Sequence, residues 1–343
     1  MKTSSGAKKL TVHDLAVLAG TSASTVSAVL NGSWQRRRIS QKLADHVNQI
    51  AEQHGYAANM QARALRRARS GIIGMLLPMY DNRYFSSIAQ KFEDMARARG
   101  LFPIVTCTQR DPRLEMDAAR ALLAYQVEYL ICTGATDPNR ITRICTEAGV
   151  PTINLDLPGT LAPSIISDNF AGARQLAHTI FDRISASDRA LGPLMFVGGR
   201  GNDHNTSERL HGFRAAHEDR GIAVKEDAIL TTGYSADIVA DALARFVAGG
   251  NALPDGIFVN STISFEGVIR WMRTTGHAEP EEHQLGCFDW DPFAELLGNG
   301  IPMIRQDVRA MLDQVFRKID AKDTTIDRIE IPTILMEFTR AKD

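Results

Sequence analysis

The sequence has few cysteines and no long apolar run, and each shortage excludes a class of protein. Only four of the 343 residues are cysteine, and none stands in a CxxC pair. We therefore expect no disulfide framework and a reducing compartment, the cytoplasm. The longest apolar run lies within residues 71–79, far short of the roughly 20 residues of a membrane-spanning helix. Residues 1–9 are basic but precede no apolar stretch, so we expect neither a secretory signal nor a membrane partner.

The common motifs of catalytic and cofactor sites are also missing. The sequence contains no HExxH metal motif and no GxSxG nucleophile motif. The glycine-rich stretch 197–201 has neither the GxGxxG spacing of a dinucleotide site nor a Walker lysine. Asp289 and Asp291 could form the carboxylate pair of a glycosidase, although sugar binding accounts for them without chemistry. We therefore expect no catalytic residue, no metal ligand and no cofactor.

Net charge is nearly absent from the whole chain, at −1, but it is unevenly distributed. Residues 1–70 carry eleven lysines and arginines against three acidic residues, which gives +8. The remaining 273 residues carry 28 basic and 37 acidic side chains, which gives −9. A basic head on an acidic body predicts a module that binds a polyanion, joined to a second module with a different task.

The head has the pattern of three short helices. Thr11 and Asp14 form a start like that of a capping box, and Gly20 ends the first apolar repeat. A second helix begins after residues 21–22, and a third spans about residues 41–54. Two short helices joined by a glycine-containing turn are typical of a helix-turn-helix, although a generic helical bundle has a similar pattern.

Residues 11–65 resemble the headpiece of LacI-family transcription regulators. The resemblance rests on TVHDLAVLAGTSASTVSAVLN from residue 11 and on ISQKLADHVNQIAEQHGYAANMQARAL from residue 39. The linker NGSWQRRRIS, residues 31–40, is similar in length to that of the Cra (fructose repressor) branch. Together they imply a protein that binds double-stranded DNA at a pseudo-palindromic operator.

The resemblance also implies which residues of the head contact DNA. Thr25 and Ser27 can donate to phosphates, whereas Ala23 and Ala28 can touch thymine methyl groups. Many relatives carry a large polar residue where Ala28 stands, so no relative's operator is carried over. Residues 36–38 form either a solvated loop or phosphate contacts, and we favour phosphate contacts. The expected contacts of the head are Thr11, Ser22, Ala23, Ser24, Thr25, Ser27, Ala28, Asn31, Arg36, Arg37 and Arg38.

Residues 59–69, NMQARALRRAR, form a thin apolar stripe among four arginines. A helix this short is marginal in water, so ordering on DNA is physically reasonable. In the family the matching segment is a hinge helix whose leucine wedges between base pairs in the minor groove. Leu65 matches that leucine, with Ala62 and Asn59 as further DNA contacts. The alternative is a solvated interdomain linker.

Beyond Ser70, short apolar runs alternate with amphipathic stretches from residue 72 to residue 288. Strand-then-helix repetition predicts parallel sheets covered on both faces, and two such series predict two doubly wound α/β lobes around a cleft. The family resemblance implies the same effector domain, similar to periplasmic binding proteins, with three crossings between lobes. We expect a head at 1–58, a hinge at 59–70 and an effector and dimerisation domain at 71–343. Within that domain we expect lobe 1 at about 71–162 plus 291–324 and lobe 2 at about 163–290 plus 325–343.

Several polar and aromatic residues stand at predicted strand ends, where they would line the cleft. The resemblance implies that Arg209 holds sugar hydroxyls or anionic groups. Leu157 stands where many relatives carry arginine, which weakens the case for a phosphorylated sugar because phosphates favour several basic contacts. Asp168 and Asn169 precede a helix and are expected to cap it. The expected effector contacts are Asn82, Tyr84, Phe85, Asp156, Arg209, Ser261, Asp289 and Trp290.

These expectations combine into one hypothesis: a homodimeric repressor whose operator affinity is modulated by a small sugar or sugar derivative. Two alternatives remain at this point. One is a sugar-binding protein whose head has no DNA role, and the other is a carbohydrate-active enzyme.

Overall fold

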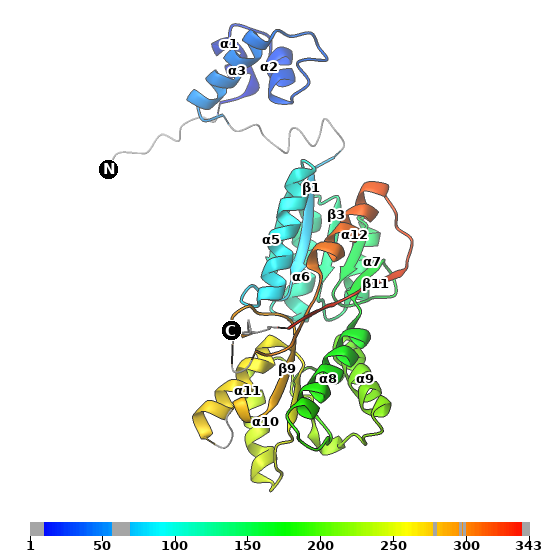
Figure 1. The fold of residues 1–343 in the computed structure, drawn as a ribbon. Helices are drawn as coiled ribbons and strands as arrows, with labels where there is room; N and C mark the ends of the chain where they lie inside the picture. The colour runs from blue at the N-terminus through cyan, green and yellow to red at the C-terminus, as the bar shows by residue number, and fades with distance from the viewer. Residues whose placement is uncertain (1–9, 57–68, 277–279, 295–296, 298–299, 338–343) are drawn as a thin grey trace, which may run out of the picture. The chain divides into compact units, whose positions relative to one another are not determined.

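The computed structural model describes residues 10–56, 69–276, 280–294, 297 and 300–337, and the chain divides into two compact units, Met1–Ser70 and Gly71–Asp343 (Figure 1). In the head, helices α1 (Val12–Leu18), α2 (Ala23–Leu30) and α3 (Gln41–Gln53) surround one small apolar core. Leu15, Val26 and Val47, one from each helix, are fully buried in it. The predicted helix-turn-helix is therefore confirmed.

Polar caps fix where the helices of the head begin. The Thr11 hydroxyl accepts the amide of Asp14, and the Asp14 carboxylate accepts the amide of Thr11 at 2.7 Å, which completes a capping box. The Ser22 hydroxyl caps α2 by accepting the amide of Thr25, and the Ser40 hydroxyl caps α3 by accepting the amide of Leu43. Each such cap stabilises its helix by about 1 kcal/mol. The beginnings of all three helices thus follow from local sequence.

The body contains two sheets of six strands, and the first belongs to lobe 1. Its strands are parallel and lie in the order β11-β5-β4-β3-β1-β2. They are β1 (Ile72–Leu77), β2 (Phe102–Cys107), β3 (Tyr129–Thr133), β4 (Thr152–Leu155), β5 (Ser164–Ser167) and β11 (Arg328–Ile331). Helices α5 (Arg83–Ala98) and α12 (Val308–Ala321) cover one face, and α6 (Pro112–Ala124) and α7 (Pro138–Glu147) cover the other.

The second sheet, in lobe 2, repeats this arrangement in the order β12-β10-β9-β8-β6-β7. Its strands are β6 (Met195–Val197), β7 (Ile229–Leu230), β8 (Gly256–Val259), β9 (Gln284–Phe288), β10 (Met303–Arg305) and the antiparallel β12 (Ile334–Met336). Helices α8 (Asn169–Ala186) and α9 (His204–Asp219) pack on one face, and α10 (Ala236–Ala248) and α11 (Thr262–Thr275) on the other. Short helices η1 (Glu226–Ala228) and η2 (Pro280–Glu282) complete the lobe. This confirms the predicted fold class.

The first crossing between lobes lies at residue 168, within the expected residues 160–168. The other two lie later than the expected residues 288–292 and 322–328, since the chain crosses at residues 306–307 and 332–333. Strand β5 pairs with β4 in lobe 1 and β10 pairs with β9 in lobe 2, so neither crossing occurs before those strands end. Strand β11 likewise pairs with β5, which keeps residues 328–331 in lobe 1. In the part of the chain that the structure describes, no helix is long and apolar enough to cross a membrane.

Candidate functional site

One surface hollow of the head gathers most of the head residues that the sequence analysis assigned to DNA. It has a volume of about 770 Å³ and lies between the N-terminus of α1, α2 and the linker that follows α2. Two arginines line it, and its described lining contains no carboxylate, which suits a polyanion. The lining residues are Val12, His13, Ala23, Ser24, Ser27, Ala28, Asn31, Ser33, Arg36 and Arg37.

Other predicted contacts of the head have local partners. Thr11 and Ser22 serve as helix caps, and the Ser22 hydroxyl lies 2.9 Å from that of Thr25. Ala28 lines the hollow but is only 3% exposed, because the chain folds back so that Ser33 donates its amide and hydroxyl to the Ala28 carbonyl. Its expected methyl contact therefore has little surface available. Arg38 is exposed, with a φ of 56°.

The hinge contacts Asn59, Ala62 and Leu65 lie outside the described residues. They stay predictions.

In the body, two buried aspartates occupy equivalent positions at the carboxyl ends of strands. Asp156 follows β4 and Asp289 follows β9, and each is the third strand of its sheet. Both have left-handed backbone, with φ of 73° and 74°, a region that aspartate tolerates better than most residues. Burial raises the pKa of Asp156 to about 6, opposed by the positive charges of Arg110 and Arg209, and burial also raises the pKa of Asp289. Two poorly solvated carboxylates, one in each lobe, therefore lie close enough for the charge of Asp289 to raise the pKa of Asp156 as well.

Hydrogen bonds join these aspartates to both lobes. Asp156 accepts from the Tyr84 hydroxyl and from the Asn205 amide, both at 3.1 Å, and Asn205 belongs to lobe 2. Asp289 accepts from Gln306 at 2.5 Å, and the Gln306 carbonyl accepts from the Ser167 hydroxyl at 2.6 Å. The hydrogen-bond network thus joins the two lobes.

Arg209 lies at the centre of this network and is only 3% exposed. It donates to the Asn169 side chain at 2.8 Å and to the Asn260 carbonyl at 2.6 Å. Its guanidinium lies 3.7 Å from the centre of the Phe288 ring. A planar cation held on three sides is well placed to bind hydroxyl or carboxylate oxygens in a fixed direction.

The remaining expected effector residues have structural tasks as well. Asn82 caps α5, and Ser261 caps α11 through the amide of Ser264. Phe85 is buried in the core of lobe 1, and Trp290 lies beneath the guanidinium of Arg305. These structural tasks leave their expected contact with an effector a prediction.

A second group of cleft residues was not identified from the sequence. Asn169 and Asn205 donate and accept within the network, although the sequence analysis gave Asn169 only a capping task; Asp168 is the actual cap. Gln306 follows β10, a three-residue strand that was missed, so its strand-end position was missed with it. Arg110 and Tyr234 follow β2 and β7, the same positional signal that identified Asp156.

The glycine-rich stretch of lobe 2 is explained by packing. Gly198 and Gly199 have φ of 94° and 78°, and a side chain on them would collide with Ser264 and Thr206. These glycines let the β6–α9 loop approach α11 closely. They do not form a nucleotide-binding loop.

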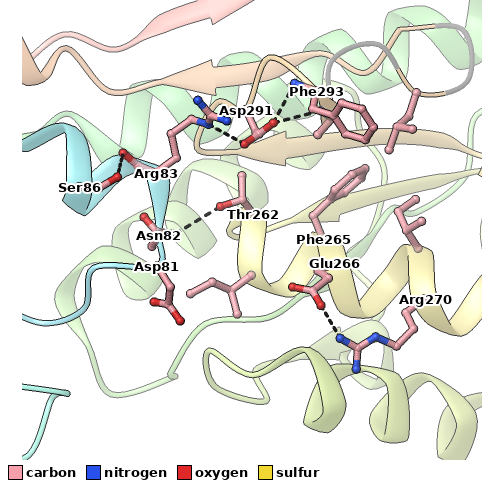
Figure 2. A pocket seen from close by; sticks show the side chains of 14 residues that line it. Asp81, Asn82, Arg83, Ser86, Thr262, Phe265, Glu266, Arg270, Asp291 and Phe293 are labelled. Carbon is pink, nitrogen blue, oxygen red and sulfur yellow. Dashed lines mark hydrogen bonds and ion pairs between the residues drawn. The ribbon is translucent and has the colours of Figure 1, made fainter.

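A groove of about 820 Å³ lies where α5 of lobe 1 approaches α11 of lobe 2 (Figure 2). Two contacts cross it from lobe to lobe. Arg83 forms an ion pair with Asp291 at 2.8 Å, and Asn82 donates to the Thr262 hydroxyl at 3.4 Å. Phe293, at the edge of the groove, is 73% exposed.

Comparison with known proteins agrees with both units. Residues 11–59 match the family of bacterial regulatory proteins, lacI family, and residues 73–295 match the periplasmic binding protein domain. The ribitol operon repressor of Klebsiella aerogenes is 57% identical over 193 residues, covering 56% of this chain and 72% of that protein. The chain belongs to the LacI family. The fructose operon regulatory protein of Vibrio cholerae is 28% identical over 267 residues, covering 76% of this chain and 78% of that one.

Solved structures of LacI-family members share the fold. A lac repressor dimer bound to operator and the anti-inducer ONPF superposes with a TM-score of 0.80 at 21% identity, covering 96% of this chain and 98% of that one. This LacI-family chain is accordingly a DNA-binding transcription regulator whose body holds an effector, and not an enzyme. Membership of this family excludes the two alternatives, a sugar-binding protein whose head has no DNA role and a carbohydrate-active enzyme. Among the described residues, no group of three or more His, Cys, Asp and Glu could hold a metal ion.

Proposed function

We propose that this regulator represses an operon for a small neutral polyol of the ribitol class, and that the polyol releases it from its operator. The 57% identity to a ribitol operon repressor supports this assignment. The main structural support for a polyol effector is that Asp156 and Asp289 are both buried at strand ends. Hydroxyl groups satisfy buried carboxylates by donating to them.

The same cleft disfavours a phosphorylated effector. A phosphate placed there would meet two carboxylates that already engage the charges of Arg110 and Arg209, whereas phosphates favour several free basic contacts. Leu157, directly after Asp156, supplies no charge. The likeness of the headpiece linker to the fructose repressor branch therefore concerns the head alone, and we propose no shared effector with that branch.

On the DNA side, we propose that the hollow of the head faces the major groove, with Arg36, Arg37 and Arg38 on phosphates. Leu65, with Asn59 and Ala62, is proposed as the minor-groove wedge. Repressor and operator meet in the cytoplasm, where chromosomal DNA lies. A two-fold dimer places two heads on the two halves of a pseudo-palindrome.

The body offers surfaces suited to contact with a second copy. Strand β2 is an edge strand in which none of the six residues is buried, and unpaired edges usually acquire a cover. The groove of Figure 2 has apolar side chains beside the exposed Phe293, an arrangement that can be self-complementary about a two-fold axis. Both features support a homodimer formed by the body.

A gel shift tests the proposal directly. The full chain is titrated onto DNA from upstream of its own gene, with excess competitor DNA, at moderate salt and with or without ribitol. We expect a specific complex that ribitol dissociates, and no effect of ribitol 5-phosphate at the same concentration. Absence of sequence preference would refute the repressor assignment, and dissociation only by the phosphate would refute the neutral effector.

A further inference from the structure

Part of the positive charge of the head has no task in the proposed function. Residues 1–70 carry eleven lysines and arginines, and the arginines within residues 36–38 and 59–69 account for seven of them. Three of the other four are Lys2, Lys8 and Lys9, which all precede the first helix. The match to the lacI family begins at residue 11, so these lysines lie before it. Their task has to be inferred from this chain alone.

The described part of the head shows where the chain enters α1. The amide and the hydroxyl of Thr11 both donate to the Asp14 carboxylate at 2.7 Å, which fixes the start of the helix. Val12, the next residue, lines the hollow of the head. Consecutive Cα atoms are about 3.8 Å apart, so the Cα of Lys9 lies within about 11 Å of the Cα of Val12. The covalent chain alone therefore keeps Lys9, and Lys8 beside it, near the hollow.

The sequence around this hollow supplies little negative charge. Asp14 is the only acidic residue among the first 44, and its carboxylate already accepts two hydrogen bonds from Thr11. Arg36 and Arg37 line the same hollow. Cations gathered in one place repel one another unless an anion lies between them. Two adjacent lysines near this hollow therefore add to a surface that needs an anion.

The composition of residues 2–9, KTSSGAKK, favours contact with phosphates over packing on the head. Ala7 is its only apolar side chain, so burial of the segment would gain little free energy. Its three hydroxyl groups can donate to phosphate oxygens, as lysine ammonium groups do. Eight residues span at most about 28 Å when extended, and one DNA strand carries a phosphate about every 3.4 Å along the helix axis. The segment is thus long enough to follow several phosphates.

We propose that residues 2–9 are a second phosphate-binding element of the head, with Lys8 and Lys9 on phosphates beside the half-site that the hollow contacts. This inference rests on the proposed function and adds DNA contacts that lie outside the matched family segment. Because phosphates carry no sequence information, the segment raises the affinity for operator and for unrelated DNA alike.

The full chain carrying Lys8→Gln and Lys9→Gln together tests the proposal. Its affinity for the DNA upstream of its own gene is measured by fluorescence anisotropy from about 50 to about 200 mM salt. The slope of log affinity against log salt should fall by about 1.8 for one lost contact in each head of a dimer, and by about 3.6 for two. The double variant Lys91→Gln and Lys225→Gln, which changes two exposed lysines of the body, is the matched control and should keep the wild-type slope.

Neutralising single phosphates shows whether the lysines contact them directly. Each duplex of the set has one phosphate replaced by an uncharged methylphosphonate. At one position or more, this replacement should weaken wild-type binding about fivefold and leave binding by the lysine variant unchanged. The same position should stay sensitive in Arg36→Gln with Arg37→Gln, because those arginines contact other phosphates. If every sensitive phosphate stays sensitive in the lysine variant, the proposed contacts do not exist.

The same measurements separate this proposal from the proposed function. A wild type that does not prefer the upstream DNA over unrelated DNA contradicts the proposed function itself. A wild type with that preference, together with an unchanged salt slope in the lysine variant, contradicts only the task of Lys8 and Lys9. A lower midpoint of thermal unfolding with an unchanged slope would show that the lysines pair with Asp14 and not with DNA, which also overturns the proposal.

Discussion

At the scale of single residues, the body contains buried polar groups held by specific partners. Arg209 donates to two oxygen acceptors, and its guanidinium lies against the Phe288 ring. His217 is fully buried and accepts the amide of Leu194 at 3.1 Å while its other nitrogen donates to the Phe213 carbonyl at 2.8 Å. Only a neutral imidazole can accept and donate at once. Substitution of Arg209 tests the response to effector, and substitution of His217 tests stability.

Replacing Arg209 by alanine should abolish the response to polyol and leave operator binding within about threefold, because the head is untouched. The control is Arg209→Lys, which keeps the charge and loses the forked donors, so it should show a partial response. The measurement is operator binding by fluorescence anisotropy across a polyol titration. A full polyol response in Arg209→Ala would remove this residue from the effector site. Thermal unfolding should also show a lower midpoint, since Asn169 and the Asn260 carbonyl lose their partner.

The buried His217 should make the stability of the protein fall as the pH falls. Burial lowers the pKa of His217, so the folded protein holds fewer protons than the unfolded chain below the usual histidine pKa of about 6.5. The contribution of His217 to the free energy of unfolding is therefore complete above about pH 6.5 and is lost as the pH falls below that value. His217→Gln can still accept and donate, and it does not titrate. Urea unfolding at pH 7.5, 6.5 and 5.5 should show a steeper loss of stability in the wild type than in this variant. Equal slopes would contradict the prediction.

At the scale of elements, the sequence predicts segments whose signal is local and misses those whose signal is distant. Strands β1, β2, β4 and β8 are each a clear apolar run between turns, so the local sequence identifies them. Helix α5 begins at Arg83, ahead of its apolar stripe, because Asn82 caps it there. Strands β10 and β12 have three residues each and are defined by pairing with each other. No short-range pattern identifies such strands.

The same contrast holds for the cleft. Strand-end position and family resemblance together pointed to Arg209 and Asp289, and strand-end position alone pointed to Asp156. Asn205 and Gln306 were missed because their task depends on contact with the other lobe. The lobe boundaries failed for the same reason, since a crossing can be located only when the pairing of its last strand is known.

Helix α12 and strand β11 are joined by one buried lysine, which gives a prediction at this scale. Lys318 is 5% exposed and lies 2.9 Å from the carboxylates of both Asp323 and Asp327, in the segment that leads to β11. Lys318→Ala should lower the free energy of unfolding by about 1–3 kcal/mol, because two carboxylates lose their partner and the stem leaves a cavity. Lys318→Met keeps the stem and should lose less. Urea denaturation measures both, and a loss below about 0.5 kcal/mol in Lys318→Ala would show that the pair contributes little.

At the scale of the whole molecule, the cleft and the head can communicate only through differential binding. If polyol favours one arrangement of the lobes and operator favours another, each ligand must weaken the other by the same factor. Contacts between the lobes, such as Arg83 with Asp291 in Figure 2, define the arrangement described here. The two units carry opposite net charges, +8 for residues 1–70 and −9 for the rest, so we expect the phosphate contacts in the head.

This division of charge predicts how operator affinity depends on salt. Each phosphate contact releases counterions, so the logarithm of affinity falls with the logarithm of salt concentration by about 0.9 per contact. If Arg36 and Arg37 each contact a phosphate, the double change to glutamine in both heads of a dimer removes four contacts and should reduce the slope by about 3.6. Affinity should fall for operator and for unrelated DNA alike, since phosphates carry no sequence information. Lys91→Gln, an exposed lysine of the acidic body, is the control and should leave the slope unchanged. An unchanged slope in the double variant would show that Arg36 and Arg37 lie in a solvated loop and do not contact phosphates.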